Sequence, residues 1–262
     1  MPRFAANIST LYPEHSLLER VDAAARDGFA AVEVQSPYAV KAADLQRAVR
    51  AARVELVLMN APQGDMDAGE RGLAALPGRE AEFDASVAEA VDYARAVAAP
   101  RVHVMAGKPP AGTDPATAEA AFIRNLRHAC AAFAPHGIRV LIEPINTRDM
   151  PGYFLTTPEQ AAAIVSRVGA ENLAMQFDVY HAQIMVGDIS TRIERYFPLI
   201  GHVQIAGVPE RNEPDTGEIN YPAVFRLLDR LGYAGWVGCE YRPARGTAPG
   251  GTSAGLGWLR RC

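Results

Sequence analysis

Cysteine is scarce in this sequence: the chain of 262 residues contains three, and no two of them form a Cys-x-x-Cys pair. Neither a disulfide framework nor a zinc–thiolate site is therefore expected. No apolar run approaches the roughly 20 residues that a membrane-spanning helix needs. Residues 1–10 also lack the apolar core of a signal peptide. These absences favour a protein of the reducing cytoplasm that has no membrane partner.

An excess of positive charge is missing as well. The 26 Lys and Arg residues are outnumbered by 30 Asp and Glu residues, which gives a formal net charge of −4. Binding to nucleic acid phosphates requires a basic surface, so no nucleic-acid partner is expected. With 49% hydrophobic residues the chain can bury a substantial core. Its length is close to the ~250 residues that are typical of a (β/α)₈ barrel.

Short β-rich runs alternate with longer helical patterns along the chain, as expected for βα units and a parallel sheet. Eight runs are predicted to be strands: 3–8, 30–35, 54–60, 101–106, 138–144, 173–178, 200–205 and 235–240. Eight such units close a barrel. An open doubly wound sheet is the alternative, but no Gly-x-Gly-x-x-Gly motif follows the first strand. We therefore predict an α/β fold with a single (β/α)₈ TIM barrel over residues 1–262.

Two segments depart from the regular alternation. The segment at 61–78 follows the third strand, and a loop of this length in a compact domain is usually functional or disordered. Because it leaves the C-terminal end of a strand, where such barrels keep their active sites, we expect a lid, with disorder as the alternative. The tail at 242–262 is rich in Gly, Pro and Ala. We expect it to be irregular, with one short helix near its end.

Four polar residues stand at the downstream ends of four successive strand candidates: Glu143, Asp178, Gln204 and Glu240. Because the C-terminal ends of parallel strands meet at one rim of a barrel, inward side chains at these positions would converge on one point. The alternate positions of the same strands are apolar, as a face covered by helices requires. These outward positions are Val140, Ile142, Met175, Phe177, Val203, Ile205, Val237 and Cys239.

The same alternation turns further polar residues of the first four strands inward. They are Asn7, Glu33, Asn60 and His103. Polar groups inside a barrel are costly unless they bind something. One inward carboxylate could simply cap a helix or pair with an arginine, but four polar ends on successive strands are harder to explain in that way. Three carboxylates and an amide oxygen form a hard ligand set, which suits Mg²⁺ or Mn²⁺. The residues thus predict an enzyme that uses one divalent metal ion.

Longer motifs surround these four residues. They are IEPIN at 142–146, QFDVYH at 176–181, GHVQIAG at 201–207 and GWVGCEY at 235–241. They resemble the hydroxypyruvate isomerase family, which belongs to the xylose-isomerase-like TIM barrels, and a sister group, the 2-oxo-tetronate isomerases. The resemblance covers nearly the whole chain and begins with FAANIS at 4–9. The Gly- and Pro-rich tail departs from the family.

The resemblance implies roles for individual residues. Glu143, Asp178 and Glu240 are the acidic metal ligands, and Gln204 stands where related enzymes commonly have a histidine ligand. Glu143 and Glu240 also form the proton-transfer pair. His181 and Arg211 are implied as substrate contacts.

Cations near the rim could hold a substrate carboxylate, because a guanidinium grips a carboxylate through two parallel hydrogen bonds. Arg211 follows the seventh strand and Lys108 the fourth, and Glu70 and Arg71 lie in the expected lid. We count Lys108 and Glu70, with His181 and Arg211, as candidate substrate-binding residues. For Lys108 a merely solvated position is the alternative.

The expected activity is a metal-dependent aldose–ketose isomerisation of a small oxo acid, through a cis-enediolate. Hydroxypyruvate to tartronate semialdehyde and 2-oxo-tetronate to 3-oxo-tetronate are the candidate reactions. A ketose 3-epimerase or an inosose-type dehydratase of the same superfamily could use the same metal and glutamates. A nuclease of the AP-endonuclease type would want more histidine ligands and a basic groove, and a barrel without activity is a further alternative. The sequence leaves a homo-oligomer open.

Overall fold

Eight parallel strands pair in chain order into a closed barrel, in which β8 also pairs with β1. The computed structural model describes residues 2–260, so the last two residues of the predicted tail lie outside the described part. The strands are β1 Arg3–Asn7, β2 Ala31–Val34, β3 Glu55–Asn60, β4 Arg101–His103, β5 Arg139–Ile142, β6 Leu173–Asp178, β7 Ile200–Ile205 and β8 Trp236–Cys239. The closed barrel confirms the predicted fold class and excludes the open doubly wound sheet.

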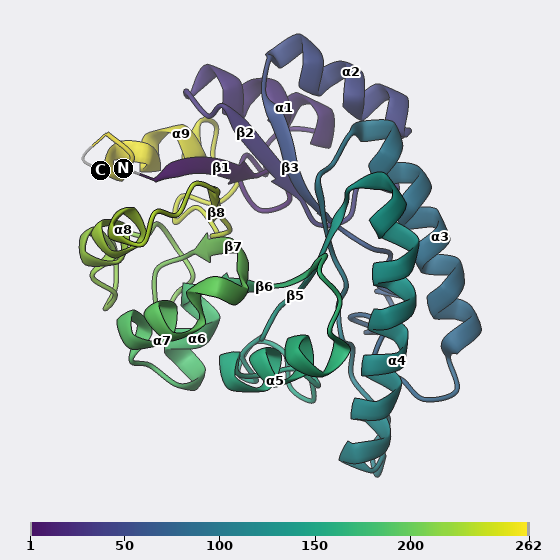
Figure 1. Cartoon of the computed structure of the whole chain (residues 1–262). Coiled ribbons are helices and arrows are strands. Elements are labelled where there is room, and N and C mark those ends of the chain that lie inside the picture. The colour runs from purple at the N-terminus through teal and green to yellow at the C-terminus, as the bar shows by residue number, and fades with distance from the viewer. Residues whose placement is uncertain (1, 261–262) are drawn as a thin grey trace.

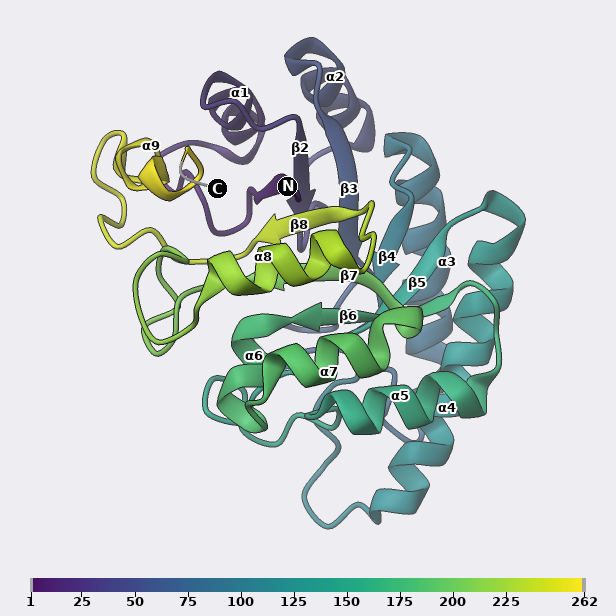
Figure 2. The same cartoon turned by 60° about the vertical axis from the view of Figure 1, so that its left-hand side comes forward.

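Helices surround the barrel (Figures 1 and 2). They are α1 Leu17–Arg26, α2 Ala42–Ala52, α3 Glu80–Val97, α4 Pro115–Phe133, α5 Pro158–Val168, α6 Val179–Met185, α7 Ile189–Tyr196, α8 Tyr221–Arg230 and α9 Gly251–Gly255. Their starts follow from local chemistry. Ser16 N donates to Glu19 Oε2 over 2.9 Å at the start of α1, and Thr117 N donates to Asp114 Oδ2 over 2.9 Å at the start of α4. Within residues 2–260 no helix is long and apolar enough to cross a membrane.

The core has two parts, which the strand alternation separates. The outward side chains of the strands, such as Ile142, Phe177 and Val203, pack with the helices in one large apolar cluster. Inside the barrel, small clusters such as Ala5, Ala31, Val57 and Trp236 form an apolar floor. Toward the C-terminal ends of the strands the inward positions become polar. The predicted orientation of both faces is confirmed.

The tail packs against the outside of the barrel, beside the seam where β1 pairs with β8. It contains α9 and a 3₁₀ turn at Leu256–Trp258, and Figure 1 shows α9 next to β1. Trp258 is 2% exposed, and its ring meets Phe4 edge-on with centroids 5.2 Å apart. The hydroxyl of Thr252 accepts a hydrogen bond from Tyr12 N over 2.8 Å. The predicted short helix is present, and it anchors the tail to the first strand and the loop after it.

Replacing Trp258 by alanine should therefore destabilise the fold. Truncating a buried tryptophan typically costs about 3–5 kcal/mol of unfolding free energy. Urea unfolding followed by circular dichroism measures this loss, and Arg260→Ala, at an exposed position two residues away, is the matched control. Equal stability of the two variants would show that the tail does not support the seam.

Candidate active site

The four predicted residues meet at the C-terminal rim inside the barrel. Glu143 and Glu240 directly follow β5 and β8, Asp178 ends β6, and Gln204 lies near the end of β7. Each of these four side chains is at most 5% exposed. Glu143 and Glu240 line a cavity of about 310 Å³, near the lower end of the ~300–1,000 Å³ of small-molecule sites. Further lining residues are Gln35, Asn60, Gln63, Arg71, His103, Asp149, Gln176, His181, Arg211 and Arg242.

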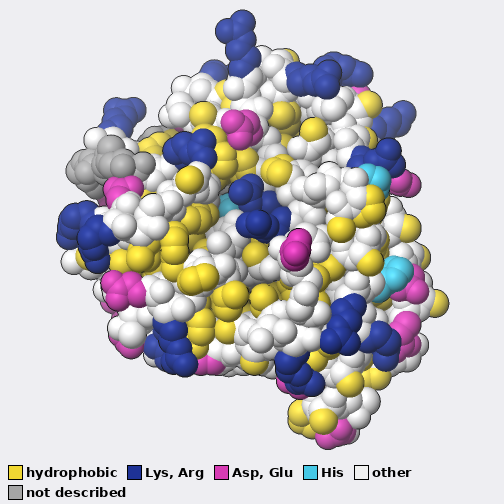
Figure 3. Space-filling model, viewed as in Figure 1, with side chains coloured by type: hydrophobic (Ala, Val, Ile, Leu, Met, Phe, Trp, Pro, Cys, Tyr) yellow, Lys and Arg dark blue, Asp and Glu magenta, His cyan; other side chains and the backbone are white. Residues whose placement is uncertain are grey.

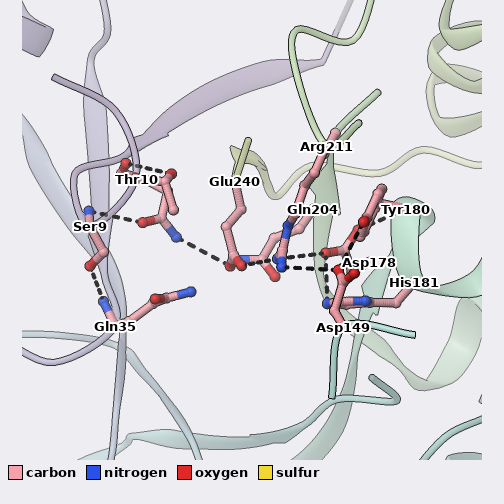
Figure 4. A network of polar contacts seen from close by, with 12 residues as sticks. Ser9, Thr10, Gln35, Asp149, Asp178, Tyr180, His181, Gln204, Arg211 and Glu240 are labelled. Atoms are coloured by element: carbon pink, nitrogen blue, oxygen red, sulfur yellow. Dashed lines mark hydrogen bonds and ion pairs between the residues drawn. The ribbon is translucent and has the colours of Figure 1, made fainter. Parts of the chain in front are cut away.

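Gln204 connects the carboxylates of this rim to a deeper layer. Its Nε2 donates to Glu240 Oε2 over 2.8 Å (Figure 4) and to Glu33 Oε1 over 2.7 Å. Its Oε1 accepts a hydrogen bond from Gln176 Nε2 over 2.6 Å. Because two carboxylates fix the orientation of the amide, the oxygen that would bind a metal faces Gln176 in this arrangement.

Glu33 is the centre of the deeper layer. Its carboxylate accepts hydrogen bonds from Asn7 Nδ2 at 3.0 Å and Gln204 Nε2 at 2.7 Å, and it pairs with His202 Nε2 at 2.7 Å. The space that it fills exists because residue 238 is glycine: a Cβ there would lie 2.4 Å from both carboxylate oxygens of Glu33. The strand alternation found Glu33 as an inward residue, but its link to Gln204 requires the barrel to be closed.

Two buried carboxylate oxygens of this site lack a hydrogen-bond partner within the described residues. They are Glu143 Oε1 and Asp178 Oδ2. They lie 3.9 Å and 3.6 Å from His181 Nε2, and ligand atoms of these three residues lie within 4.8 Å of one another. Unpartnered anionic oxygens in a buried site suit a hard divalent cation. Glu143 and Asp178 thus fit the predicted metal site as they stand.

His181 presents a proton to these two carboxylates. Its Nδ1 faces Asn146 N at 3.3 Å and Asn146 Nδ2 at 2.6 Å. The orientation of the Asn146 amide is set by Asp149, whose backbone N donates to Oδ1 over 2.7 Å. Since Nδ1 accepts from two N–H donors, the proton of the neutral ring is on Nε2. His181 is therefore arranged as a hydrogen-bond donor toward the cavity.

Arg211 covers the acidic cluster. Its guanidinium pairs with Glu240 Oε1 and lies 3.7 Å from Asp149 Oδ2 and 4.0 Å from Asp178 Oδ2. Figure 4 shows its side chain reaching from the loop after β7 to these carboxylates. The oxygens of Glu240 thus both face protein donors, Arg211 on one side and Gln204 with Asn7 on the other.

Burial controls the protonation of this site. It raises the pKa of Glu143 well above its ordinary value, and repulsion from Glu240 and Asp178 adds to the rise. Burial also raises the pKa of Asp178 to about 7, against the attraction of Arg211. The pKa of Glu240 rises mainly through burial, and Arg211 opposes this rise. Without a further cation, burial and mutual repulsion favour the protonated forms of these carboxyls.

The remaining predicted residues lie outside the lining of the cavity. Glu70 is in the 61–78 segment, and its carboxylate pairs with Arg79 Nη1 at 2.5 Å. Lys108 is half-buried after β4 and is also absent from the lining. Sequence reasoning missed Asn146 and Asp149. Both follow β5 at the rim, so the position of a loop at the C-terminal end of a strand is the signal that would have found them.

The 61–78 segment divides into two halves. Residues 64–69 are exposed. Residues 72–76 are tied to the barrel, since Gly72 bridges to Ala106 and Ala75 N donates to Ala106 O over 2.7 Å. Leu73, Ala74 and Leu76 belong to the core.

The sequence is similar along nearly its whole length to known proteins. Residues 21–262 match the family described as xylose isomerase-like TIM barrel. The chain is 55% identical to the 2-oxo-tetronate isomerase of Cupriavidus necator, over 99% of this chain and 98% of that one. It is 42% identical to the hydroxypyruvate isomerase of Escherichia coli, over 99% and 98%. A crystal structure described as an AP endonuclease, family 2, from Brucella melitensis superposes with a TM-score of 0.96 at 48% identity, over 100% and 99% of the two chains.

A buried acidic cluster at the C-terminal rim of a closed (β/α)₈ barrel defines a barrel enzyme. The chain belongs to the xylose isomerase-like TIM barrel family, which confirms the resemblance of its motifs. In accordance with its full-length relatives it is an isomerase.

The acidic cluster makes the stability of the metal-free protein depend on pH. Asp178, whose folded pKa is about 7 against an ordinary 3.8, binds a proton more tightly in the folded state. That stabilisation is present below the ordinary value and is lost as the pH rises through the folded one. The unfolding temperature of chelator-treated protein should therefore fall between about pH 4 and about pH 7 and change little above that range.

Asp178→Asn is the matched variant for this calorimetric measurement, because it keeps the oxygen that accepts from Tyr180 N at 2.8 Å. The unfolding temperature of this variant should change less with pH than that of the wild type. Mn²⁺ should stabilise the wild type more at the higher pH, since metal ligands must be deprotonated. Identical slopes for the two proteins would contradict the prediction.

Proposed function

We propose that the protein is a metal-dependent aldose–ketose isomerase of small oxo acids, with 2-oxo-tetronate and hydroxypyruvate as the first substrates to test. The observation that carries this proposal is the pair of open, buried oxygens of Glu143 and Asp178 beside Glu240 at the rim. Full-length relatives that are named isomerases of these two acids support the substrate class.

Glu143, Asp178, Gln204 and Glu240 would hold the ion, for which we propose Mg²⁺ or Mn²⁺. Their oxygens are the hard ligands that these cations prefer. Glu143 and Asp178 offer open oxygens, whereas Glu240 and Gln204 would exchange bonds to Arg211 and Gln176 for the ion. When bound, the cation would stabilise as a Lewis acid the negative charge that develops on two substrate oxygens.

Moving a carbonyl to the adjacent carbon requires two proton transfers at carbon. One C–H bond breaks beside the carbonyl, one forms at the former carbonyl carbon, and a hydroxyl proton passes from one oxygen to the other through a cis-enediolate. Glu143 and Glu240, which come from β5 and β8, would be base and acid. Positioned carboxyls with raised pKa values suit general acid–base work near neutral pH. His181 Nε2–H would donate a hydrogen bond to a substrate oxygen.

A ketose 3-epimerase or a dehydratase of the same superfamily could use the same carboxylates, so the reaction must be tested directly. A nuclease is less well supported. The cavity is small, and Figure 3 shows Lys and Arg side chains in separate groups on this face, not as a continuous basic band. A nuclease would need such a basic band to bind the phosphate backbone of its substrate.

The test is a screen of small oxo acids and neutral sugars with added Mg²⁺ or Mn²⁺, followed by NMR in D₂O. Isomerisation should convert 2-oxo acids without loss of water and should place deuterium at the carbon that gains the proton. Loss of water would favour the dehydratase. Inversion at one carbon of a neutral ketose, with no conversion of oxo acids, would favour the epimerase.

The variant Glu240→Gln should lose turnover and keep substrate binding. Removing a general acid–base group typically lowers the rate by about 10²–10⁴-fold, and Glu143→Gln should behave in the same way. Steady-state kinetics give kcat, and calorimetry checks that the variant still binds the oxo acid. The control is Glu171→Gln at an exposed position before β6. A Glu240→Gln enzyme with more than about a tenth of wild-type activity would rule out the two-glutamate mechanism.

We also propose that residues 64–71 act as the lid, because residues 64–69 are exposed and Arg71, which follows them, lines the cavity. Closing a site excludes water from a reactive enediolate. Trypsin cleavage after Arg71 should slow when Mn²⁺ and an oxo acid are present. Cleavage after Arg245, in the exposed part of the tail, should not change. Equal rates at Arg71 with and without ligand would indicate a passive surface loop.

A further inference from the structure

The walls of the cavity have different chemistry on its two sides. On the side of β5 and β6 the lining carries Glu143, Asp149 and His181. On the side of β2 and β3 it carries the neutral amides of Gln35, Asn60 and Gln63. Two arginines also line the cavity, Arg71 in the segment after β3 and Arg242 in the loop after β8. A ligand with one anionic end would therefore meet different partners at its two ends.

Arg71 is a cation without an acidic partner. One nitrogen of its guanidinium, Nη1, donates to the backbone oxygens of Met66 at 3.0 Å and Glu70 at 2.5 Å. Within residues 2–260 its Nε and Nη2 have no hydrogen-bond partner, and it forms no ion pair. These are the two donors of one edge of the guanidinium, which is the geometry that binds a carboxylate.

The turn that carries Arg71 is braced. Glu70 Oε2 accepts from Asp65 N over 2.6 Å, and Glu70 Oε1 pairs with Arg79. Gly64 lets this carboxylate approach, since a Cβ there would lie 2.1 Å from Glu70 Oε2. Glu70 thus positions its neighbour, and a preorganised donor costs less to order when the ligand binds.

Arg242 stands two residues beyond Glu240, at an exposed position of the loop after β8. Its backbone is held on both sides: its N donates to Arg211 O over 2.7 Å, and its O accepts from Asn212 Nδ2 over 2.8 Å. Its side chain lines the cavity, and among the described residues it has no hydrogen-bond or ion-pair partner.

Arg211 differs from both. Its guanidinium already faces Glu240, Asp149 and Asp178. A carboxylate ligand would have to compete with these three acids for it and would be repelled by them. Arg71 and Arg242 offer positive charge without that competition.

We propose that Arg71 and Arg242 together bind the carboxylate of the substrate and hold its carbonyl end toward Glu143 and Asp178. This assignment rests on the proposed isomerisation of oxo acids. It makes the two arginines the residues that select an acid over a neutral sugar of the same length, and it fixes which carbons lie between the two glutamates.

Binding of unreactive ligands tests the assignment without turnover. The matched pair is erythronate, a four-carbon sugar acid, and erythritol, its neutral polyol, each added to the Mn²⁺-loaded enzyme. Arg71→Gln and Arg242→Gln should each weaken the binding of erythronate by about 10- to 100-fold, as expected when one partner of a charged hydrogen bond is lost. Erythritol binding and Mn²⁺ affinity should stay at the wild-type level. Arg148→Gln is the control, because Arg148 is an exposed residue of the same rim outside the lining.

Erythronate that binds the double variant as tightly as the wild type would overturn the assignment, and so would an equal loss in Arg148→Gln. In kinetics, the variants should raise KM for the oxo acid by a larger factor than they lower kcat. A wild type that isomerises no oxo acid, but binds erythronate through these two arginines, would overturn the proposed function and support the carboxylate site.

Discussion

The structure depends on carboxylates that are buried together inside the barrel. Glu33, Glu143, Asp178 and Glu240 are each at most 5% exposed, and charged groups away from water must be paired or neutralised. The protein meets this demand with donors from distant strands: Asn7, Gln204, His202 and Arg211. Two oxygens are left over. This excess of negative charge over protein donors is what makes the rim suited to a cation.

Much of this arrangement could be predicted from the sequence because a strand has a period of two. The alternation of eight short runs with helical patterns predicted the barrel, and the period of two within each run predicted the helix-covered face and the inward polar positions. The period does not say which atom of a side chain is free. Gln204 points its nitrogen at Glu240 because Glu33, 171 residues earlier in the chain, accepts from the same amide. The saturation of Arg211 by three acids likewise depends on loops from three different strands.

The family fold does not by itself choose the substrate, since one barrel supports many chemistries. In the proposed reaction, the carboxylates of the rim, Glu143, Asp178 and Glu240, would hold the ion and move the protons. The lining also carries the amides of Gln35, Asn60 and Gln63 and the guanidinium groups of Arg71 and Arg242. In the proposed function, the carboxylates would set the reaction type, and the two arginines would set the choice of substrate.

The pairing of β1 with β8 affects how the protein folds during its synthesis. Arg3 to Ala6 pair with Trp236 to Cys239, so the first strand lacks one neighbour until the chain has been synthesised as far as Cys239. Pairings of such high sequence separation carry a large entropic cost and form late in folding. Glu240 arrives with the same strand that closes the barrel. Closure of the fold and completion of the site are therefore a single event, and a shorter nascent chain has neither.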